Sequence, residues 1–177
     1  MISGLYIAIG SQGSGKTLFQ VKNLFDEIEK NPDRTVYSNL KSLTCKHIYF
    51  NFKDFVKLVS NMDDEINNSI ILVDEMHLYF DSLDFMKKDS RIAQVFFSQL
   101  RKRDILVLGT TQYLMNLDIR IRRQAFNVFD MYHIYKSLFQ VTVNDIDGYV
   151  YSEKNRFKID LADYYDKYDT KEIITLQ

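Results

Sequence analysis

The chain has 177 residues, a length that fits one domain able to bury a hydrophobic core. Its 23 lysines and arginines against 24 aspartates and glutamates give a net charge of −1, which excludes a uniformly basic nucleic-acid coat but not a local basic patch. The single Cys45 excludes an internal disulfide and a four-cysteine zinc site. We therefore expect one domain over residues 1–177, with a core of about 4–145 and a C-terminal tail of about 146–177.

The chain carries no secretory signal and no apolar run of the roughly 20 residues that a membrane helix needs. We accordingly expect no membrane span and a reducing, nucleotide-rich compartment.

Expected strands and helices alternate along the chain. Short apolar runs predict strands at residues 5–9, 35–38, 47–50, 69–73 and 104–108. Apolar residues at helical spacing predict helices at residues 18–28, 52–59 and 92–100. Further on we expect a strand pair at 126–135 and 138–143, a hairpin turn at Asp147-Gly148, and a mobile loop at 81–89. The alternation favours an α/β fold with a mainly parallel sheet.

A phosphate-binding loop follows the first expected strand and precedes the first expected helix. It reads Gly10-Ser11-Gln12-Gly13-Ser14-Gly15-Lys16-Thr17 and matches G-x-x-x-x-G-K-[ST] in the setting that the motif requires. Backbone N–H groups of such a loop surround the β-phosphate, the lysine reaches the β- and γ-phosphates, and the Thr17 hydroxyl ligates Mg²⁺. We therefore predict a three-layer αβα P-loop NTPase domain of RecA-like type that binds ATP and Mg²⁺.

An acidic pair, Asp74-Glu75, ends the strongest expected strand. A carboxylate at that position lies beside the metal, so we expect Asp74 to hold Mg²⁺ together with Thr17. Glu75 is placed to orient and deprotonate the attacking water. The alternative is an acidic pair that only caps a strand.

Three further polar groups are candidates for the site. Gln112, after the strand at 104–108, is expected to contact the γ-phosphate or the attacking water, with a backbone-bound amide as the alternative. The cluster Arg101-Lys102-Arg103 is either a solvated helix end or the source of an arginine finger for a neighbouring subunit. A second cluster, Arg120, Arg122 and Arg123, can equally supply the finger or bind DNA phosphates.

Together with the phosphate loop and Asp74-Glu75, three spaced segments resemble the FtsK–HerA superfamily of DNA-translocating ATPases. They are residues 36–40, Leu100-Arg101-Lys102-Arg103, and Thr111-Gln112 followed by Leu117-Asp118-x-Arg120. The likeness is greatest to small viral genome-packaging ATPases and to the zonula occludens toxin (Zot)-like assembly proteins of filamentous phages.

The resemblance implies a homo-oligomeric ring, a hexamer or pentamer, that hydrolyses ATP and moves double-stranded DNA by contacts to its backbone. It implies Arg101, with Arg103 second, as the finger acting in trans, and we place Ser38 beside the nucleotide. A capsid vertex protein is an expected further partner, and the host cytoplasm or the virion the expected location.

Two other functions stay open at this point. One is a Zot-like assembly or secretion ATPase that acts on protein-coated single-stranded DNA. The other is a nucleoside kinase, for which Glu75 has no evident use and the cysteines of a thymidine-kinase zinc site are missing. Genome packaging is the leading expectation.

Overall fold

The computed structural model describes residues 1–177 except 62–63, 81–88, 148–149, 173 and 175–177. The expected loop at 81–89, apart from its last residue, and Gly148 of the expected hairpin turn therefore lie outside the described residues. The strands are β1 (Gly4–Ile9), β2 (Thr35–Ser38), β3 (Ile48–Tyr49), β4 (Ser69–Val73), β5 (Ile105–Thr110), β6 (Ala125–Tyr135), β7 (Leu138–Asp147) and β8 (Val150–Asp160). The helices are α1 (Lys16–Lys30), α2 (Phe52–Asn61), α3 (Asp89–Gln99) and the short α4 (Ile119–Arg122).

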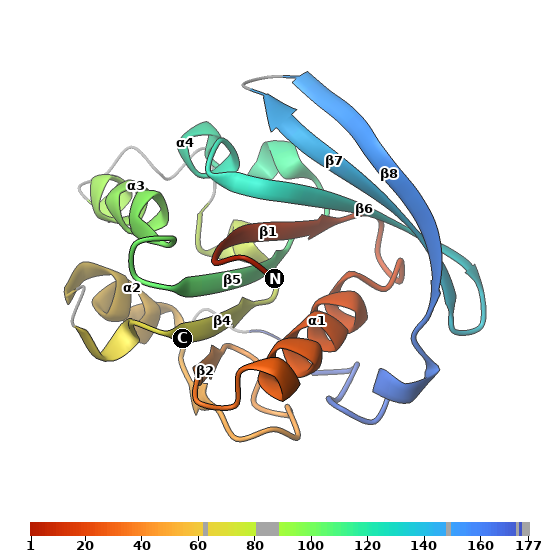
Figure 1. The fold of residues 1–177 in the computed structure, drawn as a ribbon, viewed down its shortest axis with the longest axis horizontal. Helices are drawn as coiled ribbons and strands as arrows, with labels where there is room; N and C mark the ends of the chain where they lie inside the picture. The colour runs from red at the N-terminus through yellow and green to blue at the C-terminus, as the bar shows by residue number, and fades with distance from the viewer. Residues whose placement is uncertain (62–63, 81–88, 148–149, 173, 175–177) are drawn as a thin grey trace.

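Within the described residues, the strands form one eight-stranded sheet in the order β3-β2-β4-β5-β1-β6-β7-β8. The six strands from β3 to β6 are parallel, whereas β7 and β8 continue the sheet in antiparallel fashion. Figure 1 shows α1 on one side of the sheet and α2, α3 and α4 on the other. The predicted αβα layers and mainly parallel sheet are confirmed, and β8 lies in the segment expected as a C-terminal tail.

Two apolar clusters cover the two faces of the sheet. Ile71 and Val73 of β4 belong to the cluster beneath α2, α3 and α4, while Ile70 and Leu72 belong to the cluster beneath α1. Because both faces are covered, every residue of β4 is buried. This explains why the strand reads as a continuous apolar run in the sequence and not as an alternating one.

A buried polar contact fixes α1 against the strands that carry the phosphate loop. Gln20 has no exposed surface, and its Nε2 donates to the carbonyl oxygens of Tyr6 in β1 at 3.1 Å and of Gly109 in β5 at 2.9 Å. A buried amide needs such partners to offset its lost hydration. The first half of α1 is thereby held against the middle of β1 and the end of β5.

No helix among the described residues has the length and apolarity to cross a membrane.

Candidate nucleotide site

The ends of three parallel strands bring the candidate residues together. The phosphate loop follows β1, Asp74 and Glu75 follow β4, and β5 ends at Thr110. These strands are direct neighbours in the order β4-β5-β1, so their carboxyl ends share one edge of the sheet. Ligands of open α/β sheets bind at this edge.

The phosphate loop has the backbone conformation that its glycines allow. Gly13 and Gly15 have φ angles of 74° and 86°, in the left-handed region that favours glycine, and α1 begins directly afterwards at Lys16. Two hydrogen bonds hold the loop. The Gly10 N–H donates to the Gln112 carbonyl at 3.3 Å, and within the loop the N–H of the buried Ser14 donates to the Ser11 carbonyl at 3.2 Å. An N-terminal helix end of this kind presents free N–H groups to an anion.

Lys16 lies in the cavity that this loop forms. Its Nζ donates to the Ser11 carbonyl at 2.9 Å, so the side chain bends back over the loop. Burial lowers the pKa of Lys16, and the carboxylates of Glu75 and Asp74 act in the opposite direction. The cavity has a volume of about 480 Å³, and its phosphate-loop residues are Gln12, Gly13, Gly15, Lys16, Thr17 and Leu18.

The Asp74 carboxylate lies at the centre of the site. Its Oδ1 accepts hydrogen bonds from the Thr17 hydroxyl at 2.8 Å and from the Thr110 hydroxyl at 2.6 Å. The Asn39 side chain binds both backbone groups of Asp74. Its Nδ2 donates to the Asp74 carbonyl and its Oδ1 accepts the Asp74 N–H, each at 2.8 Å. Burial raises the pKa of Asp74, and the two hydroxyl donors partly offset that shift.

Glu75 is held in an unusual backbone conformation. Its φ angle is 52°, a left-handed value that side chains other than glycine rarely adopt, and its N–H donates to the Thr110 hydroxyl at 2.9 Å. Burial, with Asp74 second, raises the pKa of Glu75, while His77 and Lys16 lower it. The His77 Nδ1 lies 3.2 Å from Glu75 Oε2. The side chain is therefore a half-buried carboxylate with one edge facing the cavity.

Seven predicted residues lie outside the cavity lining: Gly10, Ser11 and Ser14 of the phosphate loop, and Ser38, Gln112, Arg101 and Arg103. Gln112 contributes its backbone carbonyl to Gly10, as described, but its side chain is not among the lining groups. Ser38 is fully buried, and its Oγ accepts the Leu40 N–H at 3.0 Å, so its neighbour Asn39 is the residue of this segment that contacts Asp74.

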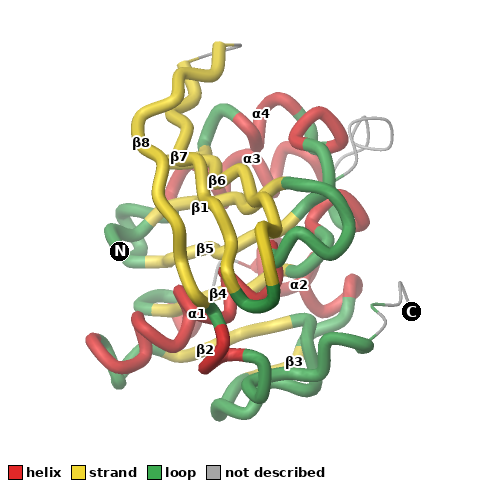
Figure 2. The backbone as a smooth tube through the Cα atoms, turned by 90° about the vertical axis from the view of Figure 1, so that its right-hand side faces the viewer, coloured by secondary structure: helices red, strands yellow, loops and turns green. Residues whose placement is uncertain are grey.

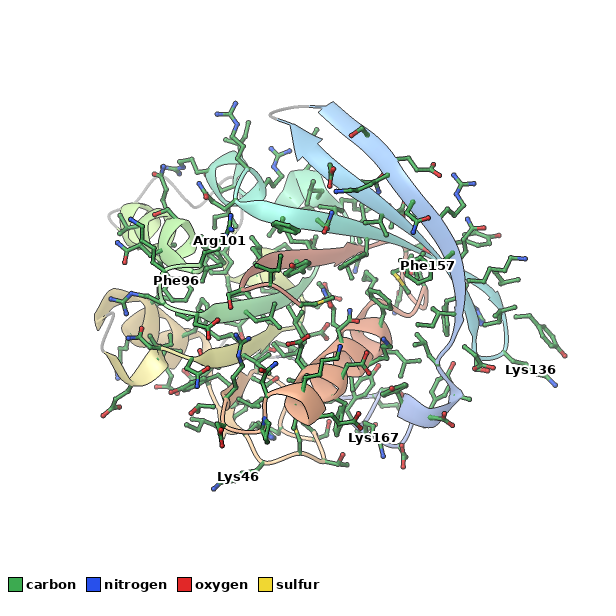
Figure 3. All side chains as sticks on the ribbon, in the orientation of Figure 1. Lys46, Phe96, Arg101, Lys136, Phe157 and Lys167 are labelled. Carbon is green, nitrogen blue, oxygen red and sulfur yellow. The ribbon has the colours of Figure 1, made fainter. Side chains whose placement is uncertain are left out.

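Arg101 and Arg103 lie at the amino ends of the parallel strands, whereas the cavity lies at their carboxyl ends. Arg101 is exposed just before β5 begins, and Figure 3 shows it near the start of β1, across the sheet from the phosphate loop. Arg103 is held by Gln99 and Asn67, each at 3.3 Å. Neither arginine can therefore reach the cavity of its own chain.

Several residues of the site were missed by sequence reasoning. Thr110 and Asn39 bind Asp74; Asn39 directly follows the strand predicted at 35–38 and Thr110 lies two residues after the strand predicted at 104–108, which was the available signal. Phe139 of β7 packs on the phosphate loop so closely that a Cβ at Gly15 would lie 2.5 Å from its ring. Residues after β8 also line the cavity. No local sequence pattern predicts these last contacts, because they join segments far apart in the chain.

Comparison with known proteins places the chain in a family. Residues 4–138 match the family model named zonular occludens toxin (Zot). The chain belongs to this family. A comparison with curated protein sequences gave no match.

Two solved structures share the fold of this Zot-family chain. The N-terminal domain of zonular occludens toxin from Neisseria meningitidis is 19% identical, with a TM-score of 0.77 over 96% of this chain and 100% of that one. The genome packaging NTPase B204 from Sulfolobus turreted icosahedral virus 2, in complex with ATP-gammaS, is 13% identical, with a TM-score of 0.58 over 80% of this chain and 92% of that one. The predicted P-loop NTPase fold is thereby confirmed.

The residues present suit a Mg²⁺ ion held jointly with a nucleotide. The described residues contain no group of three or more acidic, cysteine or histidine side chains that could hold a metal alone. Mg²⁺ in a phosphate-loop site needs only a hydroxyl and a carboxylate from the protein, because phosphate oxygens and water complete its shell. Thr17 and Asp74, joined at 2.8 Å, are such a pair in this Zot-family chain.

Removing the Thr110 hydroxyl should destabilise the fold. In Thr110→Val, the Asp74 carboxylate loses one donor and the Glu75 N–H loses its acceptor. We expect the free energy of unfolding in urea to fall by about 1–3 kcal/mol, the cost of leaving such groups unpaired. Thr110→Ser keeps the hydroxyl and should stay close to the wild type. Equal stability of the valine and serine variants would contradict this role of Thr110.

Proposed function

We propose that this Zot-family protein is a Mg²⁺-dependent ATPase. The observation that carries the proposal is the single cavity in which Lys16 and Thr17 of the phosphate loop face Asp74 and Glu75. Groups that bind phosphate, metal and water are thus present side by side. The complex of B204 with ATP-gammaS supports the choice of nucleotide, because that NTPase shares this fold.

Each side chain has a distinct part in the proposed hydrolysis. Lys16 neutralises charge on the β- and γ-phosphates, and its lowered pKa marks a partly dehydrated ammonium group whose Coulomb attraction is strong. Thr17 and Asp74 would hold Mg²⁺, which supplies further neutralisation of the phosphates. Glu75 accepts the proton of the attacking water, and its raised pKa brings it closer to the value that suits a base near neutral pH.

We further propose that hydrolysis drives the movement of DNA during virus or phage assembly. B204 is described as the DNA-packaging ATPase of its virus, which supports a DNA motor of this fold. The family match and the TM-score of the Zot domain support the Zot-like assembly role, while B204 supports the packaging role, and of the two we propose the Zot-like role. The substrate that goes with this role is protein-coated single-stranded DNA, the alternative to the double-stranded DNA that was the leading expectation from the sequence.

The position of Arg101 supports an assembly in which neighbouring chains share sites. An exposed arginine at the edge of the sheet opposite its own cavity can enter the site of a neighbour in a ring. There it would stabilise the charge that develops on the transferred phosphoryl group. Arg103 is less suited to this role, because Gln99 and Asn67 already hold its guanidinium group.

Two substitutions separate nucleotide binding from hydrolysis. We expect Lys16→Ala to abolish ATP binding, measured by calorimetry, because the main cation of the cavity is lost. Glu75→Gln should bind ATP as the wild type does but hydrolyse it at least about a hundredfold more slowly, because the proton acceptor is lost. Glu153→Gln, on exposed β8, is the matched control. Unchanged hydrolysis by Glu75→Gln would refute the base assignment.

The type of DNA can be read from its effect on the ATPase rate. We expect single-stranded DNA to stimulate hydrolysis more than duplex DNA of the same length, with little dependence on sequence because the contacts go to the backbone. Stimulation should fall as salt increases. Greater stimulation by duplex DNA would favour the packaging role, and no stimulation by either would exclude a DNA motor.

Mixed assemblies test whether Arg101 acts on a neighbouring chain. Neither Arg101→Ala nor Glu75→Gln alone should hydrolyse ATP well. Mixing the two should restore part of the rate, because some sites then pair an intact Glu75 with an intact Arg101 of the neighbour. Lys102→Ala, next to Arg101, is the control and should remain active. The absence of rescue at every mixing ratio would count against a finger in trans.

A further inference from the structure

The segment that follows β8 returns to the nucleotide cavity. We call residues 161–172 together with Ile174 the C-terminal strap. Figure 2 shows the chain leaving β8, passing α1 and running alongside β3. On α1, the Tyr164 hydroxyl donates to Asp26 at 3.3 Å, and the Lys167 Nζ lies 5.8 Å from the centre of the Phe25 ring. The strap is thus packed on the helix that begins at the phosphate loop.

The strap is fastened on one side of the cavity to the turn between β6 and β7. The Tyr165 hydroxyl donates to the carbonyl of Lys136 at 3.4 Å. Figure 3 shows Lys136 at the tip of that turn, with Lys167 further along the strap near α1. The same hairpin supplies Phe139, which packs on Gly15.

On the other side, the strap is fastened to the loop after β2. The Lys167 carbonyl accepts the Thr44 N–H at 2.9 Å. The Glu172 carboxylate accepts the N–H groups of Lys41 at 2.6 Å and Ser42 at 3.0 Å, and also the Ser42 hydroxyl. Hydrogen bonds to an ionised carboxylate are among the stronger ones in proteins. Glu172 therefore anchors the strap to the loop after β2, beside the cavity that both the strap and the phosphate loop line.

The wall that the strap adds to the cavity is aromatic and apolar. Tyr165, Tyr168 and Ile174 line the same cavity as Lys16, and Phe139 lies beside them. Tyr168 is half-buried, and this burial raises the pKa of its phenol, with the Asp74 charge adding to the shift. The cavity thus has two unlike sides, one of phosphate-binding groups and one of aromatic rings.

This wall does not suit phosphate. The strap places no cationic group in the cavity, and the Glu172 carboxylate, its charged lining group, is occupied by three donors of the loop after β2. Aromatic rings suit the flat faces of a nucleobase, and the Thr170 hydroxyl adds a polar group for its edge or for the sugar. A volume of about 480 Å³ is within the range of small-molecule sites.

We propose that the C-terminal strap and Phe139 form the nucleoside-binding wall of the site, with Tyr168 contacting the base and Glu172 positioning the strap. This inference rests on the proposed ATP-binding function. It assigns the phosphates to the loop after β1 and the nucleoside to a segment about 150 residues later, which is joined to it only in the folded chain. Affinity for ATP then depends on the strap, whereas affinity for a bare triphosphate does not.

Calorimetry with Mg²⁺-ATP and with Mg²⁺-tripolyphosphate separates the two halves of the site. For Tyr168→Ala we expect the Kd of ATP to rise by about tenfold or more, the loss typical of a stacked base. The Kd of tripolyphosphate should stay unchanged, which also shows that the phosphate loop remains folded. Tyr168→Phe should keep wild-type ATP affinity. Tyr132→Ala, on the exposed part of β6, is the matched control and should bind both ligands as the wild type does.

The anchor is tested with the same pair of ligands. Glu172→Ala should weaken ATP binding in the same direction as Tyr168→Ala and leave tripolyphosphate binding intact, because the strap is released while the phosphate loop is untouched. Glu153→Ala, an exposed glutamate of β8, should change neither. A loss of ATP affinity that the conservative Glu172→Gln partly restores would support hydrogen bonding as the cause.

Other outcomes would overturn the inference. Unchanged or tighter ATP binding by Tyr168→Ala would show that the strap contributes nothing to the site or obstructs it. Parallel loss of ATP and tripolyphosphate would assign Tyr168 a purely structural role. Failure of the wild-type protein to bind ATP would overturn the proposed function itself, and the inference with it.

Discussion

The buried carboxylate of Asp74 is the constraint on which the site depends. A carboxylate removed from water is costly unless hydrogen bonds replace its hydration. Here the donors come from different parts of the fold: Thr17 from the start of α1 and Thr110 from the end of β5, while Asn39 after β2 pairs the backbone of Asp74. The carboxylate and backbone contacts of this one residue therefore join β4 to α1, β5 and the segment after β2 at the end of the sheet where the cavity lies.

The same contacts hold the side chains of the proposed ATP hydrolysis in position. Thr17 is held next to Asp74 before any metal arrives, so little rearrangement is needed for the pair to serve as a Mg²⁺ site. Thr110 links Asp74 to the N–H of Glu75 and so supports the strained backbone that directs Glu75 toward the cavity. The proposed metal ligand and the proposed base are thus joined through one hydroxyl group. The Zot-family fold supplies this arrangement, while the hairpin of β6 and β7 and the C-terminal strap complete the cavity around it.

Local sequence patterns predicted most of the fold and the polar centre of the site. The buried strands appear as apolar runs because both faces of the sheet are covered, and the phosphate loop and Asp74-Glu75 directly follow such runs. Ser38 was predicted beside the nucleotide, whereas in the structure its side chain accepts the Leu40 N–H and the next residue, Asn39, contacts Asp74. The Phe139 contact with Gly15 and the Glu172 contact with Ser42 were not predictable, because they join residues more than 120 positions apart.

A crystal structure of the protein with Mg²⁺ and a non-hydrolysable ATP analogue tests the central claim most directly. We predict that the Thr17 Oγ1 is a direct ligand of the ion while its hydroxyl still donates a hydrogen bond to Asp74. We also predict that the Asp74–Thr110 hydrogen bond is kept and that the β-phosphate lies against the N–H groups of Gly13 to Lys16. A metal bound away from Thr17 and Asp74, or an Asp74 that turns out of the cavity in the bound state, would contradict it.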